Sequence, residues 1–443
     1  MSNKPVILGG TPVITDIPQS LHKWPIITEE DEAAVLEVLR RGAMSNIDVT
    51  KQFEEDFKKW QGREYALGFN NGTSSLLAAM WACGVGIGDE VICPTITYWA
   101  SILPVYQLGG TAVFTDIDPV SLCIKVEDIE HRITPRTKAI MIVHYLGHPA
   151  EMDKIMDIGK RHGIKVIEDY SHAQGGYYKG IKVGKWGDVS ATSLMAGKSL
   201  AIGEAGILVT DDKQLYERAV AFSHYERFTE DITDPWLSQY RGLPMGGVKG
   251  RMHQLSSAVG RVQLKYYDER SKIIRDAIDY FWSGLKGYKG LYPHRIDDSI
   301  GDMSGWYIPY GHYNPDELNG MTAADFAAAM RAEGVTDSKA GCNAPLHQHA
   351  LFQTADIYGH GKPTRIANST WDVREGDKSL PVAEKICLYM CSVPYFKQLD
   401  KESIDKYIAA FRRVLESSED INALNLQSPN VTRWFMSKQK DEK

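Results

Sequence analysis

The sequence lacks several features that would assign it to common classes of protein. Its six cysteines include no Cys-x-x-Cys pair, which favours free thiols in a reducing compartment over a disulfide framework or a zinc site. No apolar run is long enough to span a bilayer, and the first residues lack the apolar segment of a signal peptide. We therefore expect a cytoplasmic protein with no membrane partner.

The sequence also lacks an excess of positive charge and any internal repeat. Its formal net charge is −7, which argues against nucleic acid as a main partner because nucleic acids are polyanions. The chain has 443 residues, of which 43% are hydrophobic, and this is enough for more than one domain. Charged residues make up 24%, as in an ordinary folded protein.

Short apolar runs alternate with helical stretches between about residues 30 and 210. The expected strands are residues 64–69, 90–93, 112–115, 139–143, 166–167 and 188–194. Residues 74–83 and 153–162 have the pattern of helices. This alternation predicts an α/β fold with a mostly parallel sheet covered by helices. Ligands of such sheets bind beyond the carboxyl ends of the strands, so the residues after each strand are the first candidates for a site.

The first two strands are followed by groups that could bind a ligand. Residues 70–75 form a polar turn, containing Gly72, that leads into a helix. The free amides and the dipole of a helix N-terminus favour an anion such as phosphate, although Thr73 or Ser74 could equally be an ordinary N-cap. Tyr98 begins an aromatic pair after the next strand. This pair could stack on a flat ring or pack in the core.

The later strands are followed by charged groups. Glu168 and Asp169 end a strand and precede His172; buried carboxylates need a cation or hydrogen-bond donors, but the two acids could also cap a helix. Lys198 lies in a loop of small and apolar residues. It is either a solvent-exposed loop lysine or a buried lysine with a functional role. A phosphate cradle, an aromatic face, an acid and a lysine together are what pyridoxal 5'-phosphate requires.

With these motifs the sequence resembles the DegT/StrS-type aminotransferases, fold-type I pyridoxal phosphate enzymes that aminate keto sugars and keto cyclitols. The matching blocks are residues 71–73, 86–91, 133–140, 167–173 and 193–204, and the resemblance extends from residue 8 to residue 411. The loop around Lys198 looks closest to the 3-amino-5-hydroxybenzoate synthase-like members and their cyclitol and sugar relatives.

The resemblance implies an architecture and a reaction. It implies a large pyridoxal phosphate-binding domain, residues 1–265, with an N-terminal arm and a mostly parallel seven-stranded sheet between helices. A smaller α+β domain, residues 266–443, follows. Pyridoxal 5'-phosphate is the implied cofactor, glutamate or glutamine the amino donor, and a keto sugar or keto cyclitol the acceptor. A homodimer with shared active sites is expected.

The resemblance also implies catalytic roles for particular residues. Lys198 matches the Schiff-base lysine, and Asp169 matches the partner of the pyridine nitrogen. His172 matches the residue near the phenolic oxygen of the ring. Tyr98 matches the aromatic side chain that stacks on the ring.

The remaining matches concern the phosphate of the cofactor. Gly72 and Thr73 match the phosphate-binding turn, and Ser193 matches a further phosphate ligand. Lys249 and Arg251 lie in a segment that usually reads Asn-x-Arg and reaches into the site of the neighbouring subunit. Because Lys249 replaces the usual asparagine, its contact with phosphate would be that of a point charge instead of an amide.

Several alternatives are weaker. A sugar dehydratase of the same family would carry histidine in place of Lys198 or added cysteines for an iron–sulfur cluster, and an enzyme acting on an aminoshikimate-type ring is a closer variant. A nicotinamide dehydrogenase is disfavoured because the glycine cluster at residues 84–88 follows a helix instead of a strand. His347 and His349 suggest a metal site, but their family counterpart binds no metal. Residues 226–247 could shape the substrate pocket or form a surface insertion.

Overall fold

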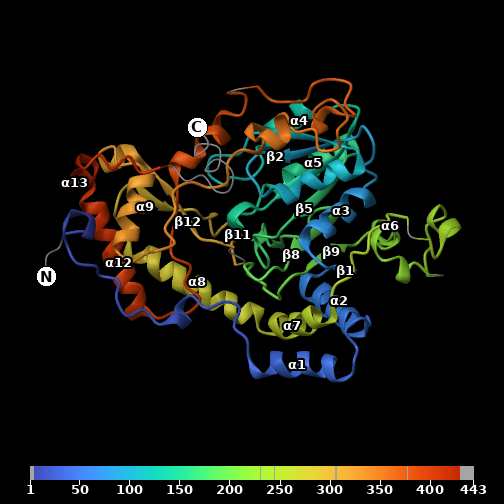
Figure 1. The fold of residues 1–443 in the computed structure, drawn as a ribbon, viewed down its shortest axis with the longest axis horizontal. Coiled ribbons are helices and arrows are strands. Elements are labelled where there is room, and N and C mark those ends of the chain that lie inside the picture. Colours follow the sequence, from blue (N-terminus) through green and yellow to red (C-terminus); the bar gives the residue numbers. More distant parts are fainter. Residues whose placement is uncertain (1–3, 230, 244, 305–306, 377, 430–443) are drawn as a thin grey trace.

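A seven-stranded sheet is the centre of the computed structural model, which describes residues 4–229, 231–243, 245–304, 307–376 and 378–429 (Figure 1). The strand order is β1-β9-β8-β5-β4-β2-β3. The strands are β1 Tyr65–Phe69, β2 Glu90–Pro94, β3 Thr111–Thr115, β4 Thr137–Val143, β5 Lys165–Asp169, β8 Val189–Ser193 and β9 Gly206–Thr210. Strand β9 is antiparallel to both of its neighbours, and the other neighbouring pairs are parallel. The predicted mostly parallel seven-stranded sheet is confirmed.

The helices that pack on this sheet are α2 Asp48–Gln61, α3 Gly72–Ala82, α4 Val126–Arg132, α5 Met152–His162 and α6 Lys213–Ser223. Helix α7 Gln254–Lys265 packs on α2, and α1 Glu29–Arg40 packs on α7. Helices α3 and α6 pack together against β1 and β9, whereas α4 packs on β3 and α5 on β5. All residues of β2, β3 and β9 are buried, which explains why these strands are continuous apolar runs. The two helices predicted in this half correspond to α3 and α5.

The second half of the chain forms a separate layer of helices beside a small sheet (Figure 1). Its elements are α8 Tyr267–Gly284, β10 Leu291–Pro293, β12 Tyr310–Tyr313, α9 Ala323–Ala332, β13 Met390–Ser392, α12 Lys401–Glu416 and α13 Ser418–Ala423. The side chain of Asp400 accepts a hydrogen bond from the Ser403 amide and caps α12. Ile14 and Leu21 from the N-terminal arm belong to the hydrophobic cluster of this half.

The predicted domain boundary at residues 265 and 266 falls between α7 and α8. Helix α8 contributes to both hydrophobic clusters, with Ile274 and Ile278 in the cluster of the large sheet and Phe281 in the other. Further along, residues between 342 and 390 return to the cluster of the large sheet. The chain therefore passes between the two halves more than once, and the boundary stays a prediction.

The remaining elements are short. They are β6 Tyr177–Tyr178, β7 Ile181–Lys182, β11 Gly301–Asp302, α10 Ala350–Gln353 and α11 Pro381–Ile386. Within the described ranges, none of the helices is both long enough and apolar enough to cross a membrane.

The contact between β9 and the start of α3 leaves no room for a side chain. A Cβ atom on Gly206 would lie 2.5 Å from the carbonyl carbon of Asn71 and 2.7 Å from the amide nitrogen of Gly72. We predict that G206A lowers the free energy of unfolding by about 1–3 kcal/mol, because backbone atoms must move apart. Denaturant unfolding measures the change. G376A is the matched control, since its Cβ meets nothing within 4 Å; equal stability of the two variants would contradict the prediction.

Candidate functional site

Seven of the nine predicted site residues line one cavity of about 350 Å³. They are Gly72, Thr73, Tyr98, Asp169, His172, Ser193 and Lys198. These residues lie at the ends of, or in the turns after, β1, β2, β5 and β8. This is where a ligand of a mostly parallel sheet is expected.

The N-terminus of α3 forms one wall of this cavity. The side-chain oxygen of Asn71 accepts a hydrogen bond from the Ser74 amide at 2.8 Å, so Asn71 is the N-cap and the alternative of a cap by Thr73 or Ser74 is wrong. A Cβ atom on Gly72 would lie 2.7 Å from the Cβ atom of Ser193. The absence of a side chain therefore brings the helix N-terminus against Ser193. Two hydroxyl groups, those of Thr73 and Ser193, thus lie near a helix end that favours an anion.

The carboxylate of Asp169 is buried and held in a fixed orientation. Its Oδ2 atom accepts a hydrogen bond from the Ser101 hydroxyl at 2.7 Å, and its Oδ1 atom accepts one from the Ser171 amide at 3.1 Å. The Ser101 hydroxyl is itself 2.8 Å from the Thr97 hydroxyl. These neutral donors satisfy the carboxylate without neutralising it, so its charge remains for a cation in the cavity.

Glu168 is fully buried and caps no helix. Its carboxylate accepts hydrogen bonds from the amides of Gly184 at 2.8 Å, Trp186 at 2.8 Å and Gly187 at 2.6 Å, and it lies 2.9 Å from Nε2 of His144. Burial raises the pKa of Glu168, but the hydrogen bond and charge of His144, with the nearby donors, outweigh it and hold the pKa at about 2. Glu168 therefore ties the loop after β7 to the sheet.

Lys198 is not a solvated loop lysine, because it is only 8% exposed. Burial lowers the pKa of its amine to about 8, although the charge of Asp169 acts in the opposite direction. The indole N–H of Trp24 donates to the Lys198 carbonyl at 2.9 Å. The amine itself lies 3.9 Å from the centre of the Tyr307 ring. At pH 7 a pKa of about 8 leaves roughly a tenth of this amine unprotonated, far more than for an ordinary lysine.

His172 and Tyr98 complete the predicted set in the cavity. The His172 ring stacks on Tyr307, with 4.3 Å between centroids and 17° between planes. The Leu146 amide donates to Nδ1 of His172 at 3.4 Å. Tyr98 lines the cavity and is 39% exposed.

Sequence reasoning missed several lining residues. Tyr307 and Asn343 belong to the second half of the chain, and Tyr307 follows Lys198 by 109 residues (307 − 198). The side chain of Asn343 donates to the Thr97 carbonyl at 2.9 Å. No pattern in the sequence brings these residues to the end of the sheet. Ser101 is different, because it lies in the polar stretch after β2, where a hydroxyl donor for a nearby acid could have been sought.

Lys249 and Arg251 do not line the cavity of their own chain. Lys249 is exposed, and Arg251 lies 3.6 Å from Glu226. Arg251 also forms an isolated antiparallel bridge with Phe69, the last residue of β1. Both residues therefore lie near the sheet but apart from the seven others.

Residues 226–247 form a projection next to α6, at the end of the molecule opposite α12 and α13 (Figure 1). Within it, Phe228 and Leu237 are buried, and Arg227 pairs with Glu54 at 2.8 and 3.0 Å. Trp236 is exposed. Within one chain, no described residue of this segment lines the cavity, so the segment is a surface feature of the single subunit.

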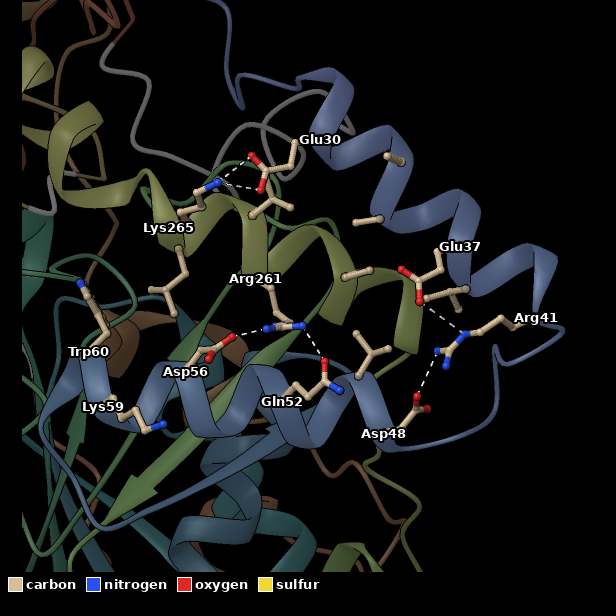
Figure 2. A pocket seen from close by; sticks show the side chains of 17 residues that line it. Glu30, Glu37, Arg41, Asp48, Gln52, Asp56, Lys59, Trp60, Arg261 and Lys265 are labelled. Carbon is tan, nitrogen blue, oxygen red and sulfur yellow. Dashed lines mark hydrogen bonds and ion pairs between the residues drawn. The ribbon is translucent and has the colours of Figure 1, made fainter.

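A larger groove lies between α1, α2 and α7 and has a volume of about 730 Å³ (Figure 2). Most of its charged side chains form ion pairs with one another, as the dashed lines in Figure 2 show, either across the groove or, for Glu37 with Arg41, along the end of α1. The pairs include Arg261 with Asp56 at 2.7 Å, Lys265 with Glu30 at 2.8 Å and Arg41 with Asp48 at 3.0 Å. Exposed ion pairs of this kind contribute little to stability, and none of the side chains in these pairs has the environment of a reactive group. The smaller cavity is therefore the candidate site.

Comparison with known proteins relates most of the chain to one group of enzymes. The family model described as the DegT/DnrJ/EryC1/StrS aminotransferase family matches residues 25–412. The L-glutamine:2-deoxy-scyllo-inosose aminotransferase of Streptoalloteichus tenebrarius is 31% identical over 437 residues, which cover 94% of this chain and 99% of that enzyme. The GDP-perosamine synthase of Escherichia coli O157:H7 is 35% identical over 263 residues, or 58% of this chain and 69% of that enzyme.

The fold is similar to that of solved aminotransferases. The crystal structure of an aminotransferase from Psychrobacter cryohalolentis superposes with a TM-score of 0.77 at 27% sequence identity. The match covers 90% of this chain and 99% of the other. The predicted fold class is confirmed.

The low pKa of Glu168 makes the free energy of unfolding depend on pH in the acid range. Because the pKa is about 2 in the folded protein and ordinarily 4.5, the charge stabilises the fold fully above pH about 4.5. This contribution is lost as the pH falls towards 2. We predict that E168Q lowers the free energy of unfolding at pH 7 by about 3 kcal/mol and flattens its decline at acid pH. Urea unfolding at several pH values measures both effects, with the exposed E64Q as control; an E168Q variant as stable as E64Q would refute the prediction.

Proposed function

The chain belongs to the DegT/DnrJ/EryC1/StrS aminotransferase family, and we propose that it transfers the amino group of glutamate or glutamine to a keto sugar or keto cyclitol. Enzymes of this family depend on pyridoxal 5'-phosphate, which is therefore the cofactor of this chain. The observation that carries the proposal is the buried amine of Lys198, with its lowered pKa, in one cavity with the buried carboxylate of Asp169. A relative named for a cyclitol substrate and one named for a sugar product support the class of acceptor.

The residues of the cavity fit this cofactor. The approach of Gly72 to Ser193, which a Cβ atom would prevent, leaves a cradle at the α3 N-terminus that suits the phosphate. Asp169, fixed by its serine donors, suits the protonated pyridine nitrogen. Tyr98 would stack on the ring, and His172 would lie near its phenolic oxygen. When bound, the cofactor supplies an aldehyde that bonds to amines and a ring that accepts the electrons of the donor carbon.

Lys198 would be the acid–base group of the reaction. Its amine, whose pKa burial lowers to about 8, would hold the cofactor through its aldehyde. As a free amine, the Nζ atom of Lys198 would take the proton from the α-carbon of the donor and hold it for return. Asp169 would keep the pyridine nitrogen protonated throughout, since its orientation is fixed by hydrogen bonds. The surrounding apolar side chains would keep water away from the amine.

We infer a homodimer in which each subunit completes the site of its partner. Among the described residues that line the cavity, Lys198 is the one lysine or arginine, whereas Asp169 and Glu204 are acidic. The phosphate of the cofactor and the carboxylates of the donor add further negative charge, which needs cations. Lys249 and Arg251 of a partner subunit are the cations proposed for this purpose.

The first test removes the amine of Lys198. K198A should load no covalently bound cofactor, should lack its visible absorbance and should show no amino transfer, because no other group can take the role of the lysine. Absorbance spectra and conversion of the cofactor by glutamate or glutamine measure these effects. K160A, at an exposed lysine on α5, is the control and should behave as the wild type. Turnover by K198A would refute the proposal.

The second test concerns the shared site. K198A and R251A should each be nearly inactive, but the coexpressed mixture should show about a quarter of wild-type activity and the isolated mixed dimers about half. Random pairing makes about half of the dimers mixed, and each mixed dimer has one intact site of two. Two different affinity tags isolate the mixed dimers for assay. Full activity of R251A alone, or no recovery in the mixed dimers, would contradict the shared site.

A further inference from the structure

Tyr307 contacts both Lys198 and His172, although no sequence motif points to it. It lies between β11 and β12, in the second half of the chain, and it lines the cavity. Its side chain is half-buried. Of the two residues that it contacts, Lys198 is the proposed acid–base group and His172 the residue proposed near the phenolic oxygen of the cofactor.

The geometry places the Lys198 amine against an aromatic ring. The Nζ atom is 3.9 Å from the centroid of the Tyr307 ring, a distance at which the ring attracts an ammonium group. The His172 ring is nearly parallel to the same ring, at 4.3 Å, which fixes the ring relative to the sheet. The ring thus occupies a defined position beside the amine.

We propose that the ring of Tyr307 is a further catalytic residue, which holds the amine of Lys198 whenever that amine is not bonded to the cofactor. This inference rests on the proposed function, because the amine is released only when a donor displaces it. A carboxylate in this place would bind the ammonium strongly and keep it protonated. A ring attracts the ammonium more weakly and excludes water, so the amine stays close in either protonation state and can move a proton.

The test separates the ring of Tyr307 from its hydroxyl. Y307F keeps the ring, whereas Y307L and Y307M keep an apolar side chain without one. In full-length protein loaded with cofactor, we expect single-turnover conversion by glutamate or glutamine to slow at least tenfold in Y307L and Y307M. We expect less than threefold slowing in Y307F, and donor affinity within threefold in all variants. Y292L, at an exposed tyrosine on β10, is the control for loss of a tyrosine elsewhere.

A second readout uses the protein without cofactor. The pH dependence of Lys198 labelling by a small amine reagent, followed by peptide mass analysis, gives the pKa of the amine. In Y307L and Y307M this pKa should fall by about one unit, because the ammonium loses the ring while water stays excluded. Y307F should match the wild type. Melting temperatures establish which variants are folded, and either non-aromatic variant suffices for both readouts.

The outcomes distinguish this inference from the proposed function. Unchanged labelling or an unchanged rate in a folded non-aromatic variant overturns the role of the ring. Slowing of Y307F as large as that of Y307L also overturns it, because the hydroxyl would then be the active group. If the wild type loads cofactor but reacts with no donor, the proposed function fails, and the labelling experiment still decides whether the ring holds the amine.

Discussion

The site depends on two adjacent carboxylates at the end of β5 that face opposite sides of the sheet. Successive side chains of a strand alternate between its faces. Glu168 therefore meets His144 and the amides of a loop, which stabilise its charge in place. Asp169 meets two serine donors and the cavity, so its charge is oriented but not cancelled. A shift of one residue in the register of β5 would exchange these environments, and the cavity would then lack its fixed acid.

The low polarity around Lys198 is produced by segments that are distant in sequence. Trp24 comes from the N-terminal arm and binds the Lys198 carbonyl. Tyr307 comes from the second half of the chain and contacts the amine. The burial that lowers the pKa of the amine therefore involves the second half of the chain as well as the sheet, while the N-terminal arm holds the backbone of Lys198. This couples the reactivity of one side chain to the completion of the whole fold.

Most strands of the sheet, the flanking helices α3 and α5 and the residues directly after the strands could be predicted from the sequence, because each depends on local patterns. A buried strand is a short apolar run, and the turn after it must lie at its carboxyl end. Strand β9 was not predicted, because it returns antiparallel directly after the Lys198 loop and breaks the alternation of strands and helices. Tyr307 and Asn343 reach the cavity through tertiary packing that no local pattern encodes. For Lys249 and Arg251 the single chain is not sufficient, because their predicted contacts lie in a second subunit.

The places where the chain departs from ordinary folding preferences gather at the cavity. Lys198 is buried against an aromatic ring, where a surface position would avoid the loss of hydration. Leu146, which also lines the cavity, has a φ of 51°, a left-handed conformation that costs a residue with a Cβ atom about 1 kcal/mol. This conformation accompanies the hydrogen bond from the Leu146 amide to His172. Such costs persist only where surrounding contacts outweigh them, and here the core of the large sheet surrounds both residues. A hydrophobic core that only stabilised the fold would need neither a buried lysine nor a left-handed leucine. Their presence together beside Asp169 and His172 is therefore an argument for chemistry at this cavity.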